Sequence, residues 1–61
     1  MAHFQGYTVE RIGSYKIIEG IGRFGGLFAA HSQRLRDLEV FNSRSDAKEH
    51  ALIVLEDVEW L

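Results

Sequence analysis

The sequence of 61 residues contains no cysteine. Disulfide bonds, which stabilise many small secreted domains, are therefore excluded, and so is a zinc site with thiolate ligands. The chain also lacks a long hydrophobic run, since its longest apolar stretch covers residues 51–55 and a membrane-spanning helix needs about 20 residues. No basic cluster followed by an apolar segment stands at the N-terminus. These absences predict a cytoplasmic protein that does not enter a membrane.

The length and composition are those of one small folded domain, residues 1–61. Hydrophobic residues make up 46% of the chain, charged residues 26%, and the net charge is only −2. A chain of about 60 residues buries only about 60% of the surface that its unfolded form exposes, so its stability is expected to be marginal. We therefore expect the domain to associate with a partner, a second copy of itself included.

The first half of the chain reads as strands separated by glycine. Residues 7–12 and 15–19 are rich in β-branched and aromatic types, and Gly13-Ser14 interrupts them, which predicts one hairpin or one long strand with a bulge. Residues 20–26 hold four of the six glycines and match the G-x-G-x-x-G pattern of dinucleotide-binding folds. Such a fold needs several further parallel strands, and only 35 residues follow Gly26. The pattern therefore predicts a turn or bulge, with no cofactor.

The second half predicts two short strands and a helix. Residues 27–30 and 38–41 would be strands, joined by a polar turn over 33–37. Ser43 and Asp46 have the spacing of a capping box at a helix start. Apolar residues then recur at helical spacing: Ala47, Ala51, Val54, Leu55 and Val58. The β-branched Ile53 and Val54 leave a strand through 51–55 as the alternative. We predict an α+β domain in which a three-stranded antiparallel sheet, a long β-hairpin plus a third strand, is packed by one C-terminal helix.

Residues suited to catalysis or metal binding are sparse. None of the three histidines, His3, His31 and His50, has a second ligand at metal spacing. His31 and Ser32 are adjacent, but neighbouring residues of a strand point to opposite faces and cannot form a nucleophile and base pair. The sequence therefore predicts neither metal site nor catalytic residues, and a protein that is not an enzyme.

Two groups of charged residues are candidates for binding a partner. Arg23, Arg34 and Arg36, with Phe24, could pair with phosphates and stack on bases, although a solvated loop or a protein contact would use the same residues. A pI of about 5.8 argues against general binding to a phosphate backbone.

The acidic C-terminal group has a different chemistry. Residues 46–61 carry a net charge of −4, and Glu56, Asp57 and Glu59 stand where a helix dipole disfavours negative charge. Beside Trp60, a residue type common at interface hot spots, these acids would suit a basic protein surface. The alternative is that Trp60 covers the domain's own core.

A family resemblance rests on four segments: residues 15–18, residues 25–29, residues 38–41, and Ser43 to Ala47 with Ala51 and Leu55 following. Together they resemble the N-terminal domain of HicB-type antitoxins, over about 47 residues from Tyr15 to Leu61. The resemblance implies a strand, strand, strand, helix unit with a partial RNase H-like fold and no catalytic residues. It also implies neutralisation of a small RNA-cleaving toxin by protein contact. Residues 32–37 stand where that family has a proline-rich turn.

In size and charge the chain also resembles the small inhibitors, anti-CRISPR proteins among them, that phages and mobile elements direct against host nucleases and CRISPR complexes. Both resemblances predict a non-enzymatic protein-binding module that inhibits or neutralises a nuclease, a toxin or a nucleoprotein complex. The alternative is a small RNA- or DNA-binding module. The predicted partner-binding residues are Glu56, Asp57, Glu59, Trp60, Arg23, Arg34 and Arg36.

Overall fold

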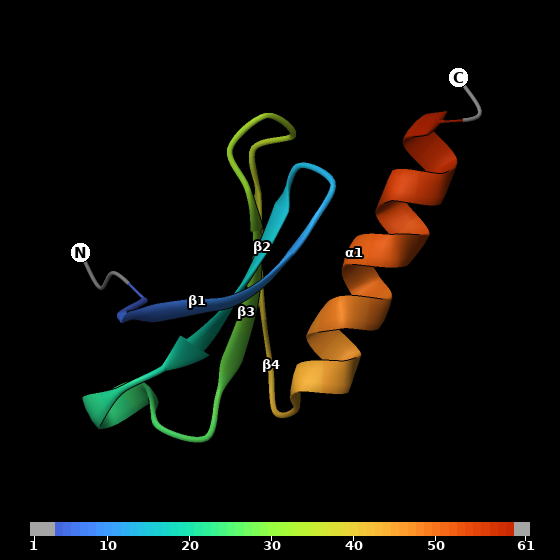
Figure 1. Ribbon diagram of the computed structural model, residues 1–61. Coiled ribbons are helices and arrows are strands. Elements are labelled where there is room, and N and C mark those ends of the chain that lie inside the picture. The colour runs from blue at the N-terminus through green and yellow to red at the C-terminus, as the bar shows by residue number, and fades with distance from the viewer. Residues whose placement is uncertain (1–3, 60–61) are drawn as a thin grey trace.

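The computed structural model describes residues 4–59, and of Glu59 only the backbone. Four strands form one antiparallel sheet in the order β1-β2-β3-β4, and one helix lies along a single face of it (Figure 1). The elements are β1 (Gly6–Ile12), β2 (Tyr15–Gly20), the 3-10 turn η1 (Gly22–Phe24), β3 (Phe28–Ser32), β4 (Asp37–Phe41) and α1 (Arg44–Glu59). The predicted α+β class with a C-terminal helix is confirmed. In the described range no helix is long and apolar enough to cross a membrane.

The prediction of three strands is wrong, because the first two segments are separate strands of a tight hairpin. Ile12 pairs with Tyr15, so the chain reverses over two residues. Gly13 makes this possible with φ +58°, a left-handed conformation that side chains other than glycine rarely adopt. The register also slips between Thr8 and Glu10, so β1 contains an irregularity as well as ending in a turn.

The glycine-rich segment is a turn, as predicted, and connects β2 to β3. Gly22 and Gly26 have φ +61° and +84°. Gly20 lies directly against the turn, because a Cβ built on it would overlap the carbonyl oxygen of Phe24. The segment thus joins neighbouring antiparallel strands, whereas a dinucleotide fingerprint joins a strand to a helix.

The helix begins as its sequence predicts. The Asp46 backbone N–H donates to the Ser43 side-chain oxygen at 3.2 Å. Ala47 and Ala51 are fully buried against the sheet residues Tyr15, Ile17 and Ala30. Small alanine side chains let the helix backbone approach the sheet closely. Further along the stripe, Val54 and Leu55 are partly buried and Val58 is 37% exposed, so the helix contact weakens toward the C-terminus.

The strand register sorts the charges of the sheet by face. On the helix side lie four acidic residues, as their cross-strand partners show: Glu10 opposite Ile17, Glu19 opposite Phe28, Asp37 opposite Ser32 and Glu39 opposite Ala30. The other face, here called the open face, carries Arg11, Lys16, Ile18, Ala29, His31, Leu38 and Val40. All acidic side chains of the strands therefore stand on one face, and all basic side chains and the histidine on the other.

Candidate interaction surfaces

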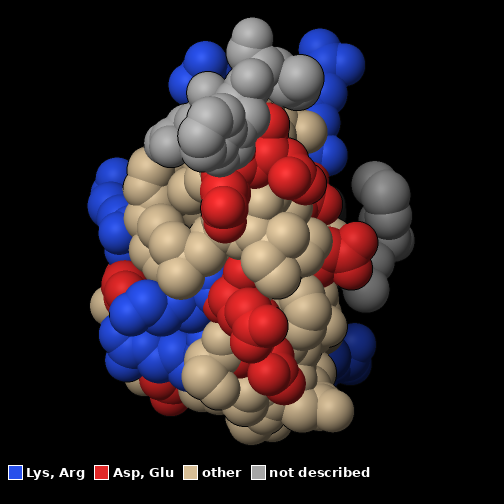
Figure 2. Space-filling view, turned by 90° about the vertical axis from the view of Figure 1, so that its right-hand side faces the viewer, with Lys and Arg blue, Asp and Glu red and all other residues tan. Residues whose placement is uncertain are grey.

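The outward side of α1 combines exposed acids with two exposed aliphatic side chains. Leu52 is 48% and Ile53 53% exposed. Around them stand carboxylates, and Figure 2 shows acidic side chains gathered along the helix with uncharged surface between them. This surface, here called the acidic helix face, consists of Asp46, Glu49, Leu52, Ile53, Glu56 and Asp57, all of them exposed. Large apolar groups framed by one sign of charge favour a protein partner of the opposite sign.

Two residues of the predicted acidic patch, Glu56 and Asp57, belong to this face. Glu56 and Asp57 are exposed in the last turns of α1, and Glu59 is its last residue. Trp60 lies outside the described residues. No basic residue occupies the last turn of the helix, so the carboxylates of Glu56 and Asp57 meet the negative end of the helix dipole without local compensation.

Sequence reasoning missed the two aliphatic residues of the acidic helix face. Leu52 and Ile53 fall outside the predicted stripe, and at 100° per residue they project away from the buried Ala47 and Ala51. The position of Leu52 and Ile53 outside the stripe already indicated, from the sequence, that the helix has apolar residues on both sides.

The three predicted arginines do not form one group. Arg34 and Arg36 lie in the tight turn between β3 and β4, where the Arg36 N–H donates to the Gln33 carbonyl oxygen at 3.2 Å. Arg23 lies in η1, which is at the other end of the sheet (Figure 1). The turn with Arg34 is at the same end as the C-terminus of α1. Any surface that uses Arg34 and Arg36 therefore does not include Arg23.

Arg34 instead lies beside residues that the sequence analysis did not assign to partner binding. A hollow of about 380 Å³, here called the basic hollow, is lined by Ser14, Lys16, His31, Gln33 and Arg34. Lys16 and His31 are direct cross-strand partners on the open face. Their proximity depends on the register between β2 and β3, which no local motif reveals.

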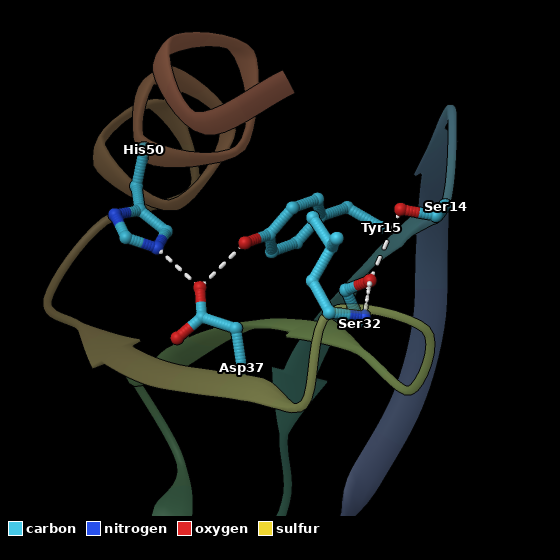
Figure 3. A network of polar contacts seen from close by, with 6 residues as sticks. Ser14, Tyr15, Ser32, Asp37 and His50 are labelled. Carbon is cyan, nitrogen blue, oxygen red and sulfur yellow. Dashed lines mark hydrogen bonds and ion pairs between the residues drawn. The ribbon is translucent and has the colours of Figure 1, made fainter. Parts of the chain in front are cut away.

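Hydrogen bonds link the two turns beside this hollow (Figure 3). The hydroxyls of Ser14 and Ser32 lie 3.0 Å apart, and the Leu35 N–H donates to the Ser32 oxygen at 3.2 Å. Ser32 is fully buried. The turn that carries Gln33 and Arg34 is thus attached to the hairpin turn that carries Ser14.

A second polar network joins the helix to the sheet. The Tyr15 hydroxyl donates to Asp37 Oδ2 at 2.5 Å, and His50 Nε2 lies 2.8 Å from the same oxygen (Figure 3). The hydrogen bond from Tyr15, followed by that from His50, lowers the pKa of Asp37. Burial, with the hydrogen bond to Asp37, raises the pKa of Tyr15. Asp37 therefore connects β4 to both β2 and α1.

A cluster of ion pairs connects the N-terminal end of α1 to the sheet. Glu10 of β1 lies 3.0 Å from Arg44 and 3.1 Å from Lys48. Its pKa is lowered by Lys48 first and Arg44 second. These two cations of α1 are thus paired with a carboxylate of the sheet, while both side chains stay about half exposed.

The two polar clusters are separate from each other in the described part of the chain. The serine hydroxyls near the Asp37 network bond to one another, and neither bonds to His50. Residues 4–59 hold no group of three side chains suited to a metal ion. Comparison with family models, with curated proteins and with solved structures finds no match to this chain.

Proposed function

We propose that this chain is a non-enzymatic protein-binding module that inhibits or neutralises a protein acting on nucleic acid. The observation that carries the proposal is the acidic helix face, where Leu52 and Ile53 are each about half exposed among four carboxylates. Adjacent aliphatic side chains bordered by carboxylates would give an interface a hydrophobic centre with a charged rim.

The partner chemistry follows from the charge. A helix of 16 residues is about 24 Å long, so its outer carboxylates are spread over a length comparable to several phosphates of a nucleic acid strand. A protein that binds nucleic acid has a basic surface, whose charge is opposite to that of the carboxylates on α1. Seated there, α1 would occlude the surface, and Leu52 and Ile53 would supply the apolar contact that a nucleic acid backbone lacks.

A mechanism of protein contact without catalysis is favoured because the polar side chains form hydrogen bonds within the fold. The carboxylate of Asp37 is shared by Tyr15 and His50 within the fold, and Ser14 and Ser32 are paired with each other. These groups hold the helix on the sheet and the turns together, which leaves them poorly placed to act on a substrate.

The antitoxin-like identity remains part of this proposal. Residues Tyr15 onward, where the resemblance to HicB-type antitoxins begins, fold as β2, β3, β4 and α1, which is the strand, strand, strand, helix order that the resemblance implies. The additional strand β1 precedes that region. An inhibitor from a phage or mobile element, including one directed at a CRISPR complex, would act by the same occlusion.

The proposal is tested by charge reversal on the helix. The wild-type protein, immobilised, is used to capture a partner from a lysate of the cells that encode it, and the partner is then purified for binding kinetics. Glu56→Lys should weaken binding about tenfold, mainly through slower association at low salt. Glu39→Lys, which makes the same charge change at an exposed residue of β4, is the matched control and should bind as the wild type does.

Two results would contradict the proposal. One is that Glu56→Lys and Glu39→Lys weaken partner binding equally, since binding would then depend on the net charge of the protein and not on the acidic helix face. The other is a partner that retains its full activity on nucleic acid when saturated with this protein.

Direct RNA or DNA binding is a second candidate function, favoured by one specific observation. The open face gathers Arg11, Lys16 and His31, and by register it carries no acidic residue of the four strands. Titration with short single-stranded and duplex oligonucleotides at two salt concentrations separates the candidates. Tight binding with a steep salt dependence would favour this function over protein occlusion.

A further inference from the structure

Three cationic or imidazole side chains stand in a row across the open face. Arg11 of β1 is the cross-strand partner of Lys16, and Lys16 is the partner of His31 of β3. Like charges directly opposite one another destabilise a sheet. In residues 4–59 the ion pairs are formed by Arg44, Lys48 and His50, so the row is not compensated by carboxylates as Arg44 and Lys48 are by Glu10.

The end of this row is hollowed. Lys16 and His31 line the basic hollow of about 380 Å³ together with Arg34, Gln33 and Ser14, and none of the described residues that line it carries a carboxylate. The five side chains offer an ammonium, a guanidinium fork, an imidazole, an amide and a hydroxyl, all of which can donate hydrogen bonds. This set of donors with two fixed positive charges is suited to a compact polyvalent anion.

We propose that the basic hollow is a binding site for a phosphate group, with Lys16 and Arg34 supplying the charge. Arginine and lysine are complementary here, because the guanidinium fork can bind two phosphate oxygens while the ammonium acts as a point charge. Gln33, His31 and Ser14 would donate to the remaining oxygens. Nothing in this site is shared with the acidic helix face, which lies on the other side of the sheet.

The hollow is held in shape before any ligand arrives. Ser32 links the two turns that border it, through the Ser14 hydroxyl at 3.0 Å and the Leu35 N–H at 3.2 Å. The same turn is closed by the Arg36 N–H, which donates to Gln33. Binding would therefore cost little ordering of the backbone, which favours affinity.

Two sources would present this chemistry, the backbone of a nucleic acid and a small phosphorylated compound. The test is a titration of ¹⁵N-labelled protein, followed by NMR, with inorganic phosphate, with a mononucleotide and with a single-stranded oligonucleotide of twelve residues. Sodium chloride at matched ionic strength is the blank. Phosphate should shift the amide signals of Ser14, Lys16, His31, Gln33 and Arg34 in a saturable manner, and chloride should not.

Variants test the assignment of the charges. Lys16→Ala and Arg34→Ala should each weaken phosphate binding about tenfold, because each removes a charge-assisted hydrogen bond. Both side chains are exposed, so the fold should persist, and dispersed amide signals verify this. Lys16→Arg should retain the binding. Arg23→Ala, which removes an exposed arginine at the other end of the sheet, is the matched control and should leave it unchanged.

The oligonucleotide distinguishes the two sources. If it binds at least tenfold more tightly than the mononucleotide, and loses affinity in Lys16→Ala, the ligand is a nucleic acid backbone; equal affinities indicate a small phosphate compound. The proposal is overturned if phosphate and chloride shift the same signals, or if Arg23→Ala weakens binding as much as Lys16→Ala and Arg34→Ala. Loss of protein binding through the acidic helix face would leave these outcomes unaffected.

Discussion

Removing the Tyr15 hydroxyl should cost far more stability than removing an exposed one. Tyr15 is fully buried, and its hydroxyl donates to a carboxylate whose pKa is lowered by that bond. Tyr15→Phe keeps the ring in the core and deletes only this interaction. A hydrogen bond to a charged group contributes about 1.5–3 kcal/mol. Because the Asp37 side chain is 27% exposed, we expect the lower part of that range, about 1.5–2 kcal/mol.

The assay is thermal unfolding followed by circular dichroism at pH 7. For a domain of this size 1 kcal/mol corresponds to about 4–8 °C, so Tyr15→Phe should lower Tm by roughly 6–16 °C. Tyr7→Phe is the matched control, because Tyr7 is 52% exposed, and it should change Tm by no more than a few degrees.

The difference between wild type and Tyr15→Phe should also depend on pH. The pKa of Asp37 is depressed in the folded state, so its contribution is present above its unfolded value of about 3.9 and is lost as pH falls through the folded value. The pKa of Tyr15 is raised, so its contribution is present below about 10 and is lost as pH rises through the folded value. The stability difference should be greatest between these limits. A Tyr15→Phe effect no larger than that of Tyr7→Phe, or one that is constant from pH 2 to 7, would refute the role assigned to Asp37.

Three further substitutions test the local structure, each by chemical or thermal unfolding. Gly13→Ala should destabilise by about 1–2 kcal/mol, because φ is +58° there and the new Cβ would lie 2.9 Å from Leu55; an unchanged midpoint would contradict the hairpin turn. Ser43→Ala should cost about 1 kcal/mol by removing the helix N-cap, and a neutral result would mean that the helix starts elsewhere. Arg36→Gly should stabilise by up to about 1 kcal/mol, because Arg36 has φ +53°, and destabilisation would show that its side chain contributes to the fold.

Local signals in the sequence predicted the elements whose cause is local. The N-cap at Ser43 and the buried Ala47 and Ala51 followed from spacing alone, and the glycine-rich segment was correctly read as a turn. The number of strands was not predicted correctly, because residues 13 and 14 are compatible with either a bulge in one strand or a reversal between two strands. The antiparallel pairing of Ile12 with Tyr15 settles that choice in favour of a reversal.

The candidate site depended on information that is not local. The segregation of charge between the faces requires the register of all four strands, and the meeting of Lys16 with His31 depends on pairing between residues 15 positions apart. Likewise the separation of Arg23 from Arg34 reflects their placement at opposite ends of the sheet. By contrast, the helical period alone could have predicted the exposure of Leu52 and Ile53, because both residues lie outside the predicted apolar stripe.

The central claim, that the outward side of α1 contacts a protein partner, is tested most directly by site-specific photocross-linking. A photoreactive amino acid replaces Leu52 on the acidic helix face or Leu38 on the open face, two positions with nearly equal exposure of 48% and 52%. Irradiation in a lysate of the encoding cells should link the Leu52 derivative to a protein that acts on nucleic acid, and the Leu38 derivative should give no such product. Cross-linking of that protein from Leu38 alone, or of nucleic acid from Leu52, would contradict the account.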